Sequence, residues 1–526
     1  MSGERVYLYD TTLRDGAQTQ GVDFSAGDKA AIAHELDRLG IDYVEAGWPG
    51  ANPTDDAFFA APPKLARARI AAFGMTRRSG RSADNDPGLQ AVLGVGAEVA
   101  TLVGKTWDFH VEVALGVSLD ENLKMIAESI AHAAKRAKET MFDAEHFFDG
   151  WRANRGFALD CLRAAHGAGA RWIVLCDTNG GMLPHDISEI VTEVTESIPG
   201  AALGIHCHND TGNAVANSLA AVRAGVRQVQ GSLNGLGERC GNANLITVIP
   251  NLMLKMGYAT GISAADLTHL TQVSHALDER LNRAPDRSAP YVGESAFAHK
   301  GGMHVSAVAK DPRSYEHVPP ESVGNRRHII VSDQAGRSNV IAQLREVGID
   351  IAAGDPKLAR LVEEVKQREF NGYSYDGAEA SFELLARRAL GTVPEFFKLL
   401  SFRVLDERRW NAKNELITLS EATIKAVIDG TTVMAVAEGN GPVSALDAAL
   451  RKVLTPRYPK LAEMHLVDYK VRILDPQSGT GASTRVIIES ADKQNARWST
   501  VGVSTNVIDA SYNALHDSIT YLLLRG

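Results

Sequence analysis

Two histidines, His206 and His208, stand two positions apart in the segment LGIHCHND. If this segment is a β-strand, both imidazoles lie on one face of its sheet, as chelation of a single cation requires. The same spacing also occurs where histidines fill a barrel in layers, but we favour metal binding. Asp15, in YDTTLRDG, offers a hard carboxylate to the same ion. Two imidazoles with oxygen ligands and no cysteine suit Mn²⁺, Mg²⁺ or Zn²⁺, with positions left for a substrate.

Two further polar residues close to predicted strand ends have two interpretations each. Arg14 either neutralises Asp15 as an ion pair or stands beside a substrate oxygen on which negative charge develops. Thr178, in CDTNGG, either caps the following helix or holds a substrate carboxylate. For an isolated threonine in a DTNGG turn the cap is the commoner role, but at the mouth of a barrel, where such enzymes carry their functional groups, Thr178 can also hold a carboxylate.

Eight short strand-like runs recur across residues 5–250, separated by alanine-rich stretches with apolar residues every three to four positions. The runs are VYLYD, DYVEAG, RIAAFGMT, EVATLVGKT, ETMFDAEHF, RWIVLCDT, LGIHCHND and RQVQGSLNG. This order predicts a (β/α)8 TIM barrel over residues 1–270, of the α/β class. An open doubly wound sheet would carry a GxGxxG loop after the first strand, and TTLRDGAQTQG lacks one.

The remainder of the chain divides into two parts. We predict that residues 271–400 form linker subdomains that complete the active site, with helices around 336–347 and 356–368. Residues 401–526 are predicted to form a C-terminal α+β domain. This last part contains a weak internal repeat in which a β-β-β-α pattern recurs 65 positions apart. Gly441, Ala445, Ala449 and Leu450 correspond to Asn506, Ala510, Ala514 and Leu515. Such a repeat serves as a dimerisation scaffold or creates a cleft for a small ligand.

Composition excludes several classes of protein. The 526 residues are 44% hydrophobic and carry a formal net charge of −9, so neither a disordered chain nor a nucleic-acid partner is expected. No run approaches the roughly 20 apolar residues of a membrane span, and no apolar signal segment precedes the first strand, so we expect a cytoplasmic protein. The four cysteines form no CxxC pair, which argues against disulfides and thiolate zinc sites.

The motifs LYDTTLRDGAQ, CDTNGG, GIHCHNDTGNAVANSLAAVRAG, NGLGERCGNANL and FAHKGGMH resemble the family of 2-isopropylmalate synthase, homocitrate synthase and citramalate synthase. The resemblance covers nearly the whole chain. FNGYSYDGAEASFELL with FDAEHFFDG is most similar to the citramalate synthase branch. These enzymes are metal-dependent TIM barrels related to hydroxymethylglutaryl-CoA lyase, and residues 401–526 resemble their regulatory domain.

The resemblance implies roles for individual residues. Asp15, His206, His208 and Asn242 would surround the divalent cation. Thr178 would hold the carboxylate of a 2-oxo acid, Gln18 would line the same pocket, and Arg14 would stabilise the enolate and alkoxide oxygens. Glu145 would be the acid of the fifth strand. Beyond the barrel, His304 and Tyr315 would be catalytic. Many members read HQD at this histidine, whereas this chain reads His304-Val305-Ser306, which leaves open the group that orients His304.

The implied reaction is a Claisen condensation of acetyl-CoA with a 2-oxo acid, followed by thioester hydrolysis. With pyruvate it would open the threonine-independent route to isoleucine, in a homodimer with isoleucine as a possible effector. The alternatives are another 2-oxo acid, a hydroxymethylglutaryl-CoA-lyase-like cleavage, and a non-catalytic amino-acid sensor. The size of the pocket would decide the substrate, and we expect Met75, Thr106, Trp107 and His110 to form its wall.

Overall fold

The computed structural model describes residues 4–329, 337–352, 354–375, 377–474, 479, 481–494 and 496–525. Contacts divide the chain into two compact units. The first consists of Met1–Phe297 with His317–Arg327, and the second of Ala298–Glu316 with His328–Gly526. Among the helices of the described ranges, none has the length and apolar character needed to cross a bilayer.

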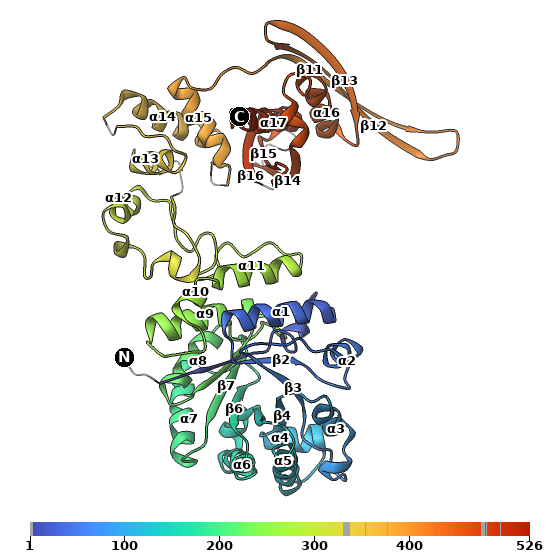
Figure 1. Cartoon of the computed structure of the whole chain (residues 1–526), viewed down its shortest axis with the longest axis vertical. Helices are drawn as coiled ribbons and strands as arrows, with labels where there is room; N and C mark the ends of the chain where they lie inside the picture. The colour runs from blue at the N-terminus through green and yellow to red at the C-terminus, as the bar shows by residue number, and fades with distance from the viewer. Residues whose placement is uncertain are drawn as a thin grey trace. The chain divides into compact units, whose positions relative to one another are not determined.

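Eight parallel strands of the first unit close into a barrel in chain order, with β1 paired to β8. In Figure 1 the strands of this unit lie at its centre, with helices around them. The strands are β1 (Tyr7–Asp10), β2 (Tyr43–Gly47), β3 (Arg69–Met75), β4 (Val99–Lys105), β5 (Glu139–Glu145), β6 (Trp172–Asp177), β7 (Leu203–Cys207) and β8 (Gln228–Gly231). Each of the eight runs contributes one strand, which confirms the predicted (β/α)8 barrel. The following helices are α1 (Ala26–Leu39), α2 (Pro53–Ala60), α3 (Pro87–Gly94), α4 (Asp108–His110), α5 (Leu119–Ala133), α6 (Phe147–Gly167), α7 (Pro184–Ser197), α8 (Ala214–Arg223), α9 (Leu245–Pro250), α10 (Ala264–Leu267) and α11 (Leu270–Arg280).

The ends of the helices follow from local sequence. Ser25 and Asp28 form a reciprocal capping box at the start of α1, which satisfies amide groups that have no partner inside the helix. The same helix ends at Gly40, whose φ of 102° is a left-handed conformation that glycine adopts without strain. A short connection then leads directly into β2, so that each helix returns the chain to the amino-terminal end of the next strand.

The interior of the barrel changes character along its axis. Tyr9, Tyr43, Met141 and Trp172 belong to an apolar cluster inside the strands, and a second, larger cluster lies between the strands and the helices. Towards the carboxyl ends of the strands the buried residues become polar and charged. This is the end at which TIM-barrel enzymes assemble their sites, so the sequence positions of the polar residues agree with the fold.

The second unit begins with short elements and helices. These are β9 (Ala298–His299), α12 (Gly302–Lys310), β10 (His328–Ile329), α13 (Arg337–Glu346), α14 (Pro356–Phe370) and α15 (Glu379–Leu390). The two helices expected around 336–347 and 356–368 correspond to α13 and α14. His304 lies in the first turn of α12 rather than in an irregular turn, and its side chain is exposed within this unit.

The carboxyl-terminal part has the predicted pair of β-β-β-α halves. The first half consists of β11 (Lys398–Trp410), β12 (Leu416–Ile428), β13 (Thr431–Gly439) and α16 (Pro442–Leu454), and the second of β14 (His465–Ile473), β15 (Thr484–Ala491), β16 (Arg497–Ser504) and α17 (Val507–Leu524). Gly441 and Asn506 occupy the N-cap positions of α16 and α17. The repeated Ala445, Ala449 and Leu450, like Ala510, Ala514 and Leu515, are buried against their sheets. One apolar cluster includes residues of both halves.

Candidate active site

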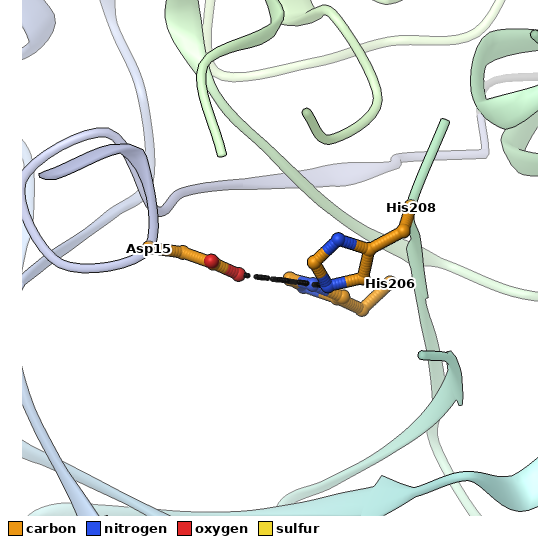
Figure 2. A group of neighbouring side chains, drawn as sticks. All are labelled: Asp15, His206 and His208. Atoms are coloured by element: carbon orange, nitrogen blue, oxygen red, sulfur yellow. Dashed lines mark hydrogen bonds and ion pairs between the residues drawn. The ribbon is translucent and has the colours of Figure 1, made fainter. Parts of the chain in front are cut away.

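Asp15, His206 and His208 converge at the carboxyl-terminal end of the barrel (Figure 2). The Nε2 atom of His206 lies 3.3 Å from Asp15 Oδ2, and that of His208 lies 3.9 Å from the same oxygen. The two Nε2 atoms are 3.3 Å apart. All three side chains are buried. Two ring nitrogens and a carboxylate that face one another in this way form a cradle for a cation.

Asn242 completes this group from the loop that follows β8. An isolated bridge pairs the backbones of His208 and Asn242, and Asn242 Nδ2 donates to Asp15 Oδ2 at 3.0 Å. Among the described residues, Asn242 Oδ1 has no hydrogen-bond partner although it is buried. A buried oxygen without a partner is costly unless it coordinates something. The donor set therefore fits a hard divalent cation, as the sequence predicts.

The electrostatics of Asp15 and His208 favour the forms that bind a metal. Burial raises the pKa of Asp15, but the charge of Arg14 and the contact with His206 outweigh it and hold that pKa well below its usual range. Burial, followed by the neighbouring His206, lowers the pKa of His208 to about 3. At neutral pH, Asp15 is thus ionised and His208 is neutral, as coordination requires.

Arg14 is held from three sides. Its Nε donates to Glu45 Oε1 at 2.6 Å, and Nη1 lies 3.8 Å from Asp15 Oδ2. The guanidinium carbon lies 3.9 Å from the centroid of the Phe73 ring. The main ion pair of Arg14 is therefore with Glu45 rather than with Asp15, which leaves the remaining guanidinium donors near the cation cradle.

A cavity of about 240 Å³ opens beside these residues. It is lined by the polar residues Arg14, Asp15, Gln18, Lys105, Asp143, Glu145, Thr178, His206, His208, Glu238 and Arg239, and by Trp48, Phe73, Met75, Val103 and Cys176. Seven predicted site residues thus share one cavity. Of the four wall positions expected from sequence, Met75 alone is among the described residues that line it. Trp107 and His110 instead stack on each other with ring centroids 5.2 Å apart.

Glu145 and Thr178 lie on the side of the cavity formed by β5 and β6. Glu145 pairs with Lys105 at the end of β4. Thr178 Oγ1 accepts a 2.8 Å hydrogen bond from the backbone amide of His146, a residue with a left-handed φ of 56°. Because α7 begins at Pro184, Thr178 does not cap that helix. With its oxygen already accepting, the hydroxyl retains its own proton for an acceptor in the cavity.

His304 and Tyr315 lie in the second unit, and their rings stack at a centroid distance of 4.1 Å and an interplanar angle of 27°. The departure from HQD had left open which group orients His304. In the structure, the Tyr315 ring contacts it. Both side chains are exposed within this unit. Both residues were expected to be catalytic, and the structure places their rings in contact.

The sequence did not single out Glu45, Lys105, Asp143 and Gln230, although all four lie in or behind the cavity. Burial, followed by the charge of Glu45, raises the pKa of Asp143 to about 7. Alternation along the strands offered a signal, since Asp143 precedes Glu145 by two positions and faces the same side of the sheet. A carboxylate in the middle of a buried strand, such as Glu45 in YVEAG, was a second signal.

Comparison with known families matches residues 5–275 to the HMGL-like family, 291–371 to the homocitrate synthase post-HMGL domain-like family, and 376–523 to the LeuA allosteric (dimerisation) domain. The chain belongs to the HMGL-like family, in the group of 2-isopropylmalate and homocitrate synthases. This confirms the resemblance seen in the motifs.

Individual relatives are more specific. The chain is 50% identical over 524 residues to the (R)-citramalate synthase of Aquifex aeolicus, covering 99% of this chain and 98% of the relative. It is 51% identical to the (R)-citramalate synthase of Geobacter sulfurreducens, covering 98% and 97%. With the probable 2-isopropylmalate synthase of Methanopyrus kandleri, identity is 31%, covering 99% of each chain.

Proposed function

We propose that this chain is an (R)-citramalate synthase, an acyltransferase that condenses acetyl-CoA with pyruvate and hydrolyses the product thioester to citramalate and CoA. The observation that carries the proposal is full-length identity of 43% to 51% with five curated (R)-citramalate synthases. The reaction is the first step of the threonine-independent route to isoleucine. Pyruvate is a small anion, and the cavity supplies the cationic groups of Arg14, Lys105 and Arg239 and the hydroxyl of Thr178 beside an apolar wall.

Asp15, His206 and His208, with the amide oxygen of Asn242, would hold a divalent cation. When bound, the cation supplies a Lewis acid that polarises the keto carbonyl of the 2-oxo acid. Mn²⁺, Mg²⁺ and Zn²⁺ all suit this donor set. The carboxylate of pyruvate would accept a hydrogen bond from the Thr178 hydroxyl, and Gln18 would contact the same substrate at the open side of the cavity.

The chain's own residues would carry the proton and charge movements. A thioester methyl is a weak acid, so its proton must pass to a positioned base while a cation meets the charge on the enolate oxygen. Arg14, fixed by Glu45, would supply that cation, and it would also meet the negative charge that forms on the keto oxygen. Glu145 and the pair His304 and Tyr315 are the proton-transfer groups in this proposal. Water then cleaves the thioester bond and CoA leaves.

The test is a thiol-release assay with acetyl-CoA and a panel of pyruvate, 2-oxoisovalerate and 2-oxoglutarate. We expect the highest kcat/KM for pyruvate. A preference for 2-oxoisovalerate would reassign the chain to 2-isopropylmalate synthase. Both acids must be measured, because one methylene in an apolar pocket changes the transition-state binding energy by only about 1–3 kcal/mol. An Asp15→Ala variant serves as the inactive control. Release of thiol without any 2-oxo acid would indicate simple hydrolysis instead.

Several wider features belong to the same proposal. A homodimer is supported by the match of residues 376–523 to a LeuA allosteric (dimerisation) domain. Isoleucine as an effector, a cytoplasmic location and the three-part division at residues 1–270, 271–400 and 401–526 rest on the sequence and the resemblance. Analytical ultracentrifugation and inhibition assays with isoleucine, leucine and valine would test the first two.

A further inference from the structure

Three buried side chains, those of His206, Gln230 and Asp143, form a continuous hydrogen-bonded chain. His206 Nδ1 lies 3.0 Å from Gln230 Oε1, and Gln230 Nε2 donates to Asp143 Oδ1 at 3.1 Å. The exposed fractions of His206, Gln230 and Asp143 are 5%, 0% and 3%. Hydrogen bonds in such surroundings are strong and leave little freedom to the groups that make them.

The barrel builds this chain from three strands. In the register of β7 against β8, His206 stands opposite Gln230. Gln230 then reaches across the interior to Asp143 on β5, 87 positions earlier in the sequence. The contact is therefore a product of barrel closure and not of local sequence.

The chemistry of the amide determines the tautomer of His206. An amide oxygen can only accept a hydrogen bond, so the Nδ1 atom of His206 must carry the proton that it donates. A neutral imidazole has one ring proton, and Nε2 is then left with a free electron pair. This Nε2 is the atom that lies 3.3 Å from both Asp15 Oδ2 and His208 Nε2.

Asp143 determines which end of the amide faces His206. Its Oδ1 accepts from Gln230 Nε2, so the amide nitrogen has a partner on that side and the amide oxygen is turned towards the imidazole. His208 provides the contrast, since its Nδ1 is buried without a hydrogen-bond partner among the described residues. Of the two histidines in the cradle, His206 is thus the one whose tautomer the barrel fixes.

We propose that Gln230 and Asp143 are positioning residues that hold His206 in its Nδ1-protonated tautomer and thereby direct Nε2 towards a divalent cation. The inference rests on the proposed metal-dependent function. Groups that bond the outer nitrogen of a metal-binding histidine orient its ring and raise its basicity, and their loss typically weakens metal affinity ten- to a hundredfold.

The first experiment reads the tautomer directly in the metal-free, full-length protein. Long-range ¹H–¹⁵N correlation spectra of protein labelled at histidine distinguish a protonated Nδ1 from a protonated Nε2. The His206 signal is assigned by its disappearance in a His206→Asn variant. We expect Nδ1 to be protonated in the wild type. A neutral His206 protonated at Nε2 instead of Nδ1 overturns the proposal, whether or not any variant folds.

The second experiment measures Mn²⁺ binding by titration calorimetry. Gln230→Leu removes the acceptor and should raise the Kd for Mn²⁺ ten- to a hundredfold, whereas Gln230→Glu retains an acceptor and should stay within a few-fold of the wild type. Gln228→Leu is the matched control. Gln228 lies two positions earlier on β8, is equally buried, and bonds the sulfur of Met141 at 3.4 Å instead of a histidine.

The outcomes are separable. An unchanged Kd in Gln230→Leu, with a melting temperature close to that of the wild type, overturns the proposal. An equal loss of affinity in Gln228→Leu also overturns it, because the effect would then come from general loosening of the barrel. If the wild-type protein binds no divalent cation, the proposed metal function fails, and the tautomer measurement still decides the role of Gln230.

Discussion

Arg14 and Glu45 form a buried ion pair in which 2.6 Å separates Arg14 Nε from Glu45 Oε1. The other carboxylate oxygen of Glu45 accepts a 2.7 Å hydrogen bond from the hydroxyl of Tyr9. Glu45 has no exposed surface. Its charge therefore fixes the guanidinium and does not contact solvent, which makes Glu45 the residue that orients Arg14.

The ion pair predicts the effect of a Glu45→Gln variant. The amide has nearly the same shape but weaker attraction for the guanidinium, so Arg14 should shift away from its position beside the cavity. Small displacements of this kind cost about 100-fold in rate, and we expect kcat to fall by about that factor. Tyr9→Phe removes only the outer hydrogen bond and should cost less. Equal kcat values for wild type and Glu45→Gln would contradict the orienting role.

Removal of metal should lower both activity and thermal stability. A cation that binds only the folded state stabilises it by about 2.7 kcal/mol at 100 times its Kd. After dialysis against EDTA, added Mn²⁺ should therefore raise the melting temperature and restore thiol release. The double variant His206→Ala, His208→Ala should show neither response. His110→Ala is the control, because His110 packs on Trp107 outside the cradle and should leave the Mn²⁺ response intact.

The raised pKa of Asp143 predicts a pH dependence of pyruvate binding. Burial, followed by the charge of Glu45, places this pKa at about 7, so the carboxyl is mostly protonated at pH 6 and mostly ionised at pH 8. Ionisation adds a negative charge to the wall of a cavity that binds an anion. The KM for pyruvate should accordingly rise as the pH passes from 6 to 8. In Asp143→Asn, which stays neutral, the KM should be nearly constant over this range.

The eight strands and the His206 and His208 pair were predictable because both depend on local patterns. Alternating apolar runs mark strands, and a two-residue spacing on a strand has one geometric consequence. The contacts between Gln230 and Asp143, or between Arg14 and Glu45, join residues 87 and 31 positions apart. Such pairs depend on barrel closure and strand register, which no local pattern contains.

The errors have equally physical causes. The wall was expected around Trp107 and His110, but these rings pack on each other and towards His146 instead. The alternative of Thr178 as a helix cap assumed that α7 starts directly after the strand, whereas the turn extends to Leu183. In both cases the length and path of the loop after the strand determine where these side chains lie, and composition does not encode that length.

His304 provides a test that does not depend on the barrel residues. A histidine exchanges protons near neutrality, and its stacking on Tyr315 fixes the plane of the ring. His304→Ala should lower kcat by about 10²–10⁴ while the Mn²⁺ content stays unchanged. Tyr315→Phe keeps the stacked ring and separates a packing role from a role of the hydroxyl. A normal kcat for His304→Ala would remove this residue from the mechanism.

Mixed dimers extend this test to the origin of His304. If His304 and Arg14 act on one substrate from different subunits, a mixture of His304→Ala and Arg14→Ala proteins should regain activity after subunit exchange. Exchange is verified with two differently tagged chains. No regain after verified exchange would place the complete site within one chain.

The carboxyl-terminal repeat contains a contact that only glycine allows. A Cβ atom on Gly502 in β16 would lie 2.0 Å from the carbonyl oxygen of Ala510 and 2.8 Å from the backbone nitrogen of Ala514, both on α17. The helix backbone cannot retreat without losing its packing on the sheet. Gly502→Ser should therefore destabilise this module by about 1–3 kcal/mol, the usual cost of overpacking.

At Gly441, the N-cap of α16, no described atom lies within 4 Å of an added Cβ, and the φ of −174° is extended backbone open to any residue. The same change to serine there should leave thermal unfolding unchanged. Differential scanning calorimetry of both variants, with light scattering for the oligomeric state, measures the difference, and equal melting curves would show that the strand and helix are not in close contact at Gly502.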